Sequence, residues 1–138
     1  MITVFVLLVL FQLKHFFADY PLQTKYMLGK FKDYGWEKPL LAHVGVHAFF
    51  TFLITCYFGV FHAVCFAGID ATIHFVMDRF KADKRYLGRF KSLTEETAPT
   101  ATKEQWRSNN FFWWSLGLDQ MVHHLTHYFI IFWLATHL

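Results

Sequence analysis

The sequence predicts an all-α integral membrane protein, a four-helix bundle formed by a single transmembrane domain over residues 1–138. Three observations indicate this fold class. The chain is 55% hydrophobic and 21% aromatic, which is more apolar surface than a soluble domain of 138 residues can bury. Its apolar residues form four stretches of about 17–25 residues, the length of a membrane-spanning helix. All but one of its 13 Lys and Arg residues lie in segments 25–38 and 79–107.

The first predicted span covers residues 2–19. Its apolar run is interrupted near the end, where the long stem of Lys14 is expected to carry its ammonium to the membrane interface. Pro21 favours a helix end at about this point. No basic region or small-residue cleavage site of a signal peptide precedes the span, so it is expected to remain in the protein. Residues 20–39 form an interfacial loop, in which a short amphipathic helix is expected.

The second and third predicted spans cover residues 40–58 and 60–80. Pro39 suits the first turn of the second span, where its missing N–H is not needed. Only a few residues are available between the two helices, so they form an antiparallel hairpin. Cys56 and Cys65 lie on either side of this turn. A disulfide is one alternative, but free thiols are favoured because nothing else in the chain is typical of a disulfide framework.

Residues 81–110 contain most of the charge and form an exposed loop, followed by the fourth span over residues 111–136. Within the loop, Thr102 and Gln105 have the spacing of a helix-capping box, which predicts a short helix. Aromatic residues at the start of the fourth span indicate an interfacial belt, formed by Trp106, Trp113 and Trp114.

The charge distribution predicts the orientation of the spans. Four spans place both basic loops, 20–39 and 81–110, on the same side of the membrane. By the positive-inside rule these loops are cytoplasmic and both termini are outside. Nucleic acid is not an expected partner, because no basic stretch is interleaved with exposed aromatic residues.

Each predicted span carries ionisable side chains four residues apart, which places them on one face of a helix. Ionisable groups in a membrane span are rare and by default face the interior of the bundle as a functional site. At a rise of about 1.5 Å per residue, all of them fall in the cytoplasmic half of the bilayer, which indicates one convergent centre. The predicted metal ligands are His15, Asp19, His43, His47, Asp70, His74, Asp78, Asp119 and His123.

The other four histidines of the chain are not among the predicted ligands. His127 continues the stripe of the fourth span more deeply. His124 points about 100° away from its neighbour on a helix, and His62 and His137 lie toward the outer side.

A bound divalent cation is the favoured interpretation, because it would offset the free-energy cost of burying the carboxylates. An Asp near the bilayer centre costs roughly 2.5–3.5 kcal/mol, which a lone interhelical hydrogen bond does not offset. Imidazole and carboxylate ligands suit zinc, manganese or iron, and this ligand set is large enough for one or two ions. Two alternatives stay open, a proton-active or structural Asp–His network and unrelated side chains that reach the interface.

Several of these motifs together resemble a known family. They are His15-Phe-Phe-Ala-Asp19-Tyr-Pro-Leu-Gln23, His43-x-x-x-His47, Asp70-x-x-x-His74 and Asp119-Gln-x-x-His123. The chain resembles a family of small polytopic membrane proteins from bacteria and their phages that is catalogued as a domain of unknown function. The resemblance implies a multi-pass protein of the bacterial inner membrane and a phage origin.

Two looser similarities concern activity. The pattern is similar to bacterial inner-membrane proteins described as metal-dependent hydrolases. The His123-His124-x-x-His127 run is similar to membrane desaturases and hydroxylases, which are much longer chains with more histidine boxes. This second similarity ranks below the first.

The first functional hypothesis is a membrane-embedded metal-dependent hydrolase of a lipid or lipid-linked substrate at the cytoplasmic leaflet. The metal would lower the pKa of bound water toward about 7, and a spare Asp or His would act as general base. A phosphate ester would be guided by basic residues of the loops, namely Lys25, Lys30, Lys81, Lys84 and Arg85.

Two alternatives belong to other classes of protein. The first is a non-enzymatic small membrane protein that binds a partner membrane complex and has a structural Asp–His core. The second is a proton or metal-ion conductor, which would require a homo-oligomer because four spans are few for a monomeric transporter.

Overall fold

The computed structural model describes residues 2–90 and 100–137. In these residues the chain is all helical, as predicted. Its elements in chain order are α1 (Ile2–Asp19), η1 (Met27–Phe31), α2 (Glu37–Thr55), η2 (Cys56–Phe58), α3 (Val60–Ala82), η3 (Leu87–Phe90), α4 (Lys103–Arg107) and α5 (Asn110–His137), where η denotes a 3₁₀ turn.

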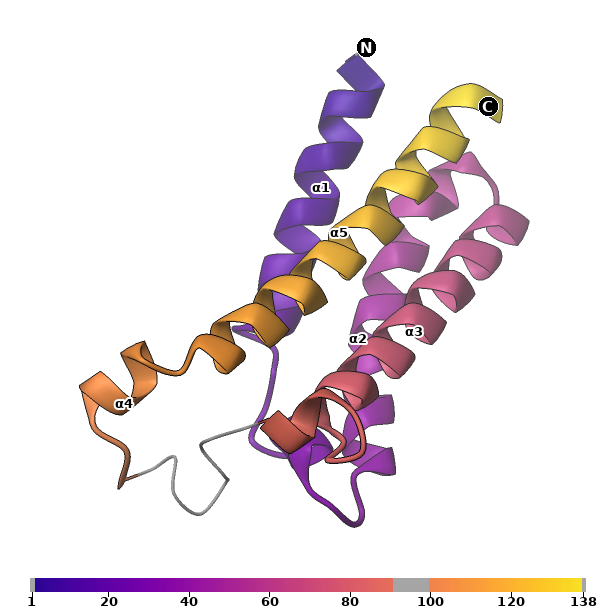
Figure 1. The fold of residues 1–138 in the computed structure, drawn as a ribbon. Helices are drawn as coiled ribbons and strands as arrows, with labels where there is room; N and C mark the ends of the chain where they lie inside the picture. The colour runs from indigo at the N-terminus through magenta and orange to yellow at the C-terminus, as the bar shows by residue number, and fades with distance from the viewer. Residues whose placement is uncertain (1, 91–99, 138) are drawn as a thin grey trace.

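The four long helices lie side by side (Figure 1). Helix α1 contacts α2 and α5, and α3 also contacts α2 and α5, so the four helices enclose a common interior. Both chain ends lie at the same end of the helices, next to the η2 turn, whereas α4 lies at the opposite end (Figure 1).

The long helices begin and end close to the expected positions. Helix α1 covers the residues of the first expected span, and α2 begins at Glu37 with Pro39 inside its first turn. Among the described residues, two segments are long and apolar enough to cross a membrane by length and composition. They are Glu37–Phe58 and Val60–Ala82.

The connectors contain only short elements. The loop after α1 has the 3₁₀ turn η1 where an amphipathic helix was expected. The predicted capping box of α4 is confirmed, because Gln105 N–H donates to Thr102 Oγ1 at 3.2 Å and Thr102 N–H donates to Gln105 Oε1 at 2.8 Å. The part of the basic loop over 91–99 lies outside the described residues.

Asp83 is the C-cap residue of α3. It accepts from the Arg85 guanidinium at 2.8 Å and from the Arg79 guanidinium at 3.0 Å. These hydrogen bonds, chiefly that of Arg85, hold the pKa of the Asp83 carboxyl well below its usual range. The charged side chains around Asp83 therefore fix one another at the helix end.

The interior is apolar in one half and polar in the other. The apolar cluster joins the beginning of α1, the beginning of α3 and the end of α5, so it lies near the chain ends. It consists of Leu7, Phe11, Phe66, Ile130, Ile131 and Leu134. The buried ionisable residues lie beyond it, toward the connectors. The half near the chain ends is therefore held by apolar packing, and the other half contains the ionisable side chains.

The outward faces of all four long helices carry large apolar side chains. Examples are Phe5 of α1, Phe49 of α2, Phe61 of α3 and Phe132 of α5, each more than half exposed. So much exposed apolar surface is typical of contact with lipid or a partner. Cys56 and Cys65 are free thiols, as the sequence favoured.

Gly59 offers a test of the α2–α3 hairpin. Its φ of 114° lies in a region that favours glycine, so Gly59→Ala strains the turn and should lower the free energy of unfolding by about 1–3 kcal/mol. Denaturation in detergent, followed by circular dichroism, measures this loss. Gly45→Ala is the matched control, because Gly45 lies within α2 and has open space around it. Equal stability of both variants would contradict the assigned turn.

Candidate metal centre

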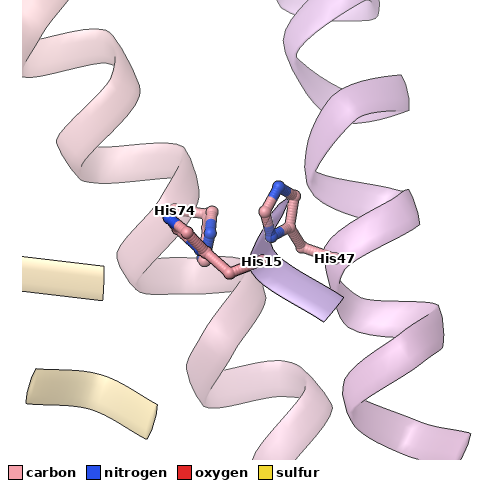
Figure 2. A group of neighbouring side chains, drawn as sticks. All are labelled: His15, His47 and His74. Atoms are coloured by element: carbon pink, nitrogen blue, oxygen red, sulfur yellow. The ribbon is translucent and has the colours of Figure 1, made fainter. Parts of the chain in front are cut away.

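The structure brings all the residues predicted as metal ligands into one buried cluster. Figure 2 shows His15, His47 and His74 pointing toward one another from three different helices. The ring centroids of His47 and His74 are 3.9 Å apart, and those of His74 and His123 are stacked at 3.7 Å. His43 lies 4.8 Å from His47 by the same measure. The imidazoles therefore form a continuous group in the interior.

Asp19 is surrounded by imidazoles. Its carboxylate lies 3.0 Å from His47 Nε2, 3.4 Å from His43 Nε2 and 3.1 Å from His15 Nε2. Gln120 donates its side-chain N–H to Asp19 Oδ2 at 3.2 Å and accepts at its Oε1 from His15 Nε2 at 2.8 Å. The side chain of Asp19 is 14% exposed, so it is the most accessible carboxylate of the centre.

Asp70 is neutralised by a lysine, which corrects the prediction for Lys14. The Lys14 ammonium donates to Asp70 Oδ2 at 2.6 Å, and its side chain is 1% exposed, so it does not extend to the interface. Thr51 donates to the same oxygen at 2.7 Å, and His127 Nε2 lies 3.2 Å from the other. Lys14 is buried because a paired carboxylate replaces the water that its ammonium loses.

Lys30 and Lys81 neutralise the other two carboxylates. Lys30 of η1 donates to Asp78 Oδ2 at 2.7 Å, and Lys81 donates to Asp119 Oδ2 at 2.7 Å. Burial lowers the pKa of the Lys30 ammonium, and the charge of Asp78 opposes this shift. Both ammonium groups are thus engaged with internal carboxylates, whereas the sequence predicts that they guide a substrate from the loops. Lys84 pairs instead with Asp33 at the surface.

The formal charges of the centre do not cancel. Four carboxylates carry −4, the three ammonium groups carry +3, and the sum is −1 while the imidazoles are neutral. Each lysine lies at a carboxylate other than Asp19, whose ion-pair partners among the described residues are histidines. The excess negative charge therefore resides at Asp19.

Six buried imidazole nitrogens have no hydrogen-bond partner among the described residues. An imidazole nitrogen without a donor or acceptor partner is available to bind a metal or water. The six are Nδ1 of His15, His43, His47, His123 and His127, and Nε2 of His74. The centre therefore offers more imidazole nitrogens for binding a metal or water than its internal hydrogen bonds occupy.

Three groups of side chains have the spacing of metal ligands. In each, one ligand atom per residue lies within 4.8 Å of the others. Two atoms each about 2.0–2.1 Å from a tetrahedral zinc ion are roughly 3.3 Å apart. The separations of Asp19 from its imidazoles, 3.0–3.4 Å, match this value. The groups are Asp19–His43–His47, His15–His47–His74 and Asp78–Asp119–His123.

Sequence reasoning missed several partners of the centre. Lys81 could have been found, because it lies three residues after Asp78 on the same helix face, and His127, which continues the stripe of the fourth span, contacts Asp70. Lys30 shows no such signal, since it comes from a connector. Of the remaining histidines, His62 lies against Trp133 near the chain ends, away from the centre. His124 lies beside His15, with ring centroids 4.9 Å apart.

Fold and site together define a class of protein. In the part that the structure describes, the chain is all helical, two helices are long and apolar enough to cross a membrane, and His/Asp clusters could hold a metal. The chain belongs to the family described as protein of unknown function (DUF3307), whose model matches residues 7–138, and this confirms the predicted resemblance. Neither the curated proteins nor the solved structures give a match.

The Lys14–Asp70 pair can be tested by a double-mutant cycle. Lys14→Met leaves Asp70 buried without its counter-charge, so the free energy of unfolding should fall by about 3–5 kcal/mol. Adding Asp70→Asn should restore much of this loss of stability, because neither residue of the pair then carries an unpaired buried charge. Thermal unfolding in detergent measures both changes. Lys25→Met, at an exposed position, is the control, and equal stability of Lys14→Met and Lys25→Met would refute the assigned pair.

Proposed function

We propose that this chain is a multi-pass membrane protein that binds one divalent transition metal at Asp19, His43 and His47. The ion would activate water to hydrolyse a lipid or lipid-linked substrate at the cytoplasmic leaflet. The observation that carries the proposal is the environment of Asp19, a largely buried carboxylate with three imidazole nitrogens within 3.4 Å and, among the described residues, no lysine at ion-pair distance. Zinc, manganese and iron suit this donor set.

The membrane part of the proposal rests on the outer faces and the ends of the helices. Large apolar side chains are exposed on α1 and α5 as well as on the two helices apolar enough to span. Four passes agree with both chain ends lying at one end of the helices (Figure 1). The described parts of the basic segments, 25–38, 79–90 and 100–107, lie at the other end of the helices, which favours a cytoplasmic location for that end.

The formal charge of the centre favours the binding of one divalent ion. A divalent ion would change the formal charge of the centre from −1 to +1, and release of one proton from the loaded centre would make it neutral. A neutral centre is the least costly one to keep in a low-dielectric interior. Burial would therefore assist the metal in lowering the pKa of the water, which is the step that generates the nucleophile.

The neighbours of Asp19 fit the other roles of a hydrolase. Three protein ligands leave the fourth position of a tetrahedral ion open for water. His15 lies next to this group and is oriented by Gln120, whose Oε1 it approaches at 2.8 Å. We assign His15 as the general base, because an oriented imidazole beside a metal-bound water can take its proton.

A row of polar side chains between α1 and α5, here called the polar seam, supports lateral access of a substrate from the bilayer. Gln12, on the exposed face of α1, lies 3.4 Å from His124 Nδ1, and His124 in turn lies against His15. Gln120 continues the seam to Asp19. Away from Asp19 the polar interior ends at the buried apolar cluster near the chain ends. This closure favours a site that opens on one side over a conducting path.

The three lysine–aspartate pairs favour a second candidate, a non-enzymatic protein with a structural polar core. Lys14, Lys30 and Lys81 neutralise their carboxylates from within the chain. In such a protein the exposed apolar faces would contact a partner membrane complex or another copy. The two candidates differ in what they require of Asp19. A metal site needs its negative charge, whereas a structural core does not.

Metal analysis separates these candidates. Detergent-purified protein, loaded with zinc and desalted, should retain about one ion per chain. Asp19→Asn should weaken zinc affinity at least about 100-fold, because it removes the anionic ligand while keeping its size. Asp33→Asn, which alters an exposed pair with Lys84, should bind zinc as the unmodified chain does. Equal zinc retention in Asp19→Asn and Asp33→Asn would exclude the assigned site.

The orientation predicts opposite results for two reporter fusions. A reporter inserted at Tyr34, in the connector before α2, should be active as a cytoplasmic protein. The same reporter after the C-terminus should report the outside compartment. Activity of both fusions in the cytoplasm would rule out four passes with outer termini.

A further inference from the structure

Lys81 lies between two carboxylates from different helices. Its ammonium is 2.7 Å from Asp119 Oδ2 on α5 and 3.2 Å from Asp78 Oδ1 on its own helix, α3. His123 Nε2 lies 3.2 Å from the second oxygen of Asp119. The side chain of Lys81 is 13% exposed, so this bridge is largely removed from solvent.

The surroundings of this ammonium are those of a cation site. Asp78, Asp119 and His123 offer ligand atoms within 4.8 Å of one another and are all buried. His123 also has a buried Nδ1 without a hydrogen-bond partner among the described residues. Two carboxylates and an imidazole are a common donor set for divalent transition metals.

We propose that the Lys81 ammonium occupies the position of a second metal ion and thereby limits the centre to one ion. Lys81 is on this account a specificity-determining residue for metal number. The inference rests on the proposed function only for the first ion, at Asp19. The second position, defined by Asp78, Asp119 and His123, would take a divalent transition metal once the ammonium is removed.

The charges around the two positions explain why the ammonium excludes a metal. With Lys81 in place, Asp78 and Asp119 face two ammonium groups, those of Lys30 and Lys81, so their charge is already balanced. A divalent ion beside them would add uncompensated positive charge in a buried site. Lys81 is tethered three residues from Asp78 on one helix face, so it does not diffuse away as an ion would.

The two positions adjoin each other. His43 Nε2 lies 3.4 Å from the Asp19 carboxylate and 3.3 Å from the Asp78 carboxylate. Two-metal hydrolases hold their ions about 3.5–4 Å apart and clamp both the attacking and the leaving oxygen. In this chain the second clamp would be an ammonium, which can bind a leaving oxygen but cannot activate water.

Lys14 shows that a buried lysine alone does not make such a position. Its ammonium contacts one carboxylate, that of Asp70, and the imidazole of His127, while Thr51 donates to the same Asp70 oxygen. Removing this ammonium therefore exposes no pair of carboxylates. Lys14→Met is thus the matched control for Lys81→Met.

The test is metal counting on the full chain purified in detergent, with zinc as the probe. Lys81→Met should bind one zinc ion more per chain than the unmodified protein, whereas Lys81→Arg and Lys14→Met should gain none. The double variant Lys81→Met/Asp119→Asn should also gain none, because one anionic ligand is missing. A folded Lys81→Met protein with an unchanged zinc count would overturn the proposal, as would an equal gain in Lys14→Met.

The outcomes separate this proposal from the proposed function. If the unmodified chain binds no zinc and Lys81→Met binds one ion, the Asp19 site fails and the role of Lys81 stands. If the unmodified chain binds one ion and Lys81→Met still binds one, the reverse holds. If Lys81→Met accumulates only when cells are supplied with zinc, the ion replaces the ammonium in folding. Failure to accumulate with zinc, while the double variant accumulates, would contradict the proposal.

Discussion

A carboxylate buried among helices must meet a positive charge, and this requirement governs how the parts of this chain assemble. Asp70 of α3 meets Lys14 of α1, Asp78 of α3 meets Lys30 of η1, and Asp119 of α5 meets Lys81 of α3. Each pair joins two different elements. Because an unpaired partner would be strongly destabilising, the three pairs position α1, α3, α5 and the connector η1 relative to one another.

Helix α2 is attached to this framework through histidines. His43 and His47 reach the carboxylate of Asp19 on α1, which forms no ion pair with a lysine of the described residues. The excess negative charge and the accessible edge of the centre therefore occur at the same residue. The apolar cluster around Phe11 and Phe66 completes packing in the other half, near the chain ends. Structural pairing and the proposed chemistry are in this way divided between neighbouring carboxylates of one interior.

Helical spacing was sufficient to predict the helices and the histidine–aspartate cluster, because both depend on local periodicity. It was insufficient for two of the three lysine partners, Lys14 and Lys30. The sequence predicts Lys14 at the interface, since a long stem usually carries its ammonium to water, but here Asp70 provides the partner in the interior. Lys30 comes from a connector, and its pairing with Asp78 depends on how the chain folds back after α1. Such contacts are tertiary and leave no trace in spacing along the chain.

The most direct measurement of the central claim is X-ray absorption at the zinc edge of the zinc-loaded protein. A metal held by Asp19, His43 and His47 predicts a four-coordinate shell of nitrogen and oxygen at about 2.0–2.1 Å, with the outer-shell scattering of imidazole rings. The imidazole signal should be lost in His43→Ala/His47→Ala. A six-coordinate oxygen shell without imidazole scattering in the unmodified protein would contradict a metal centre at Asp19.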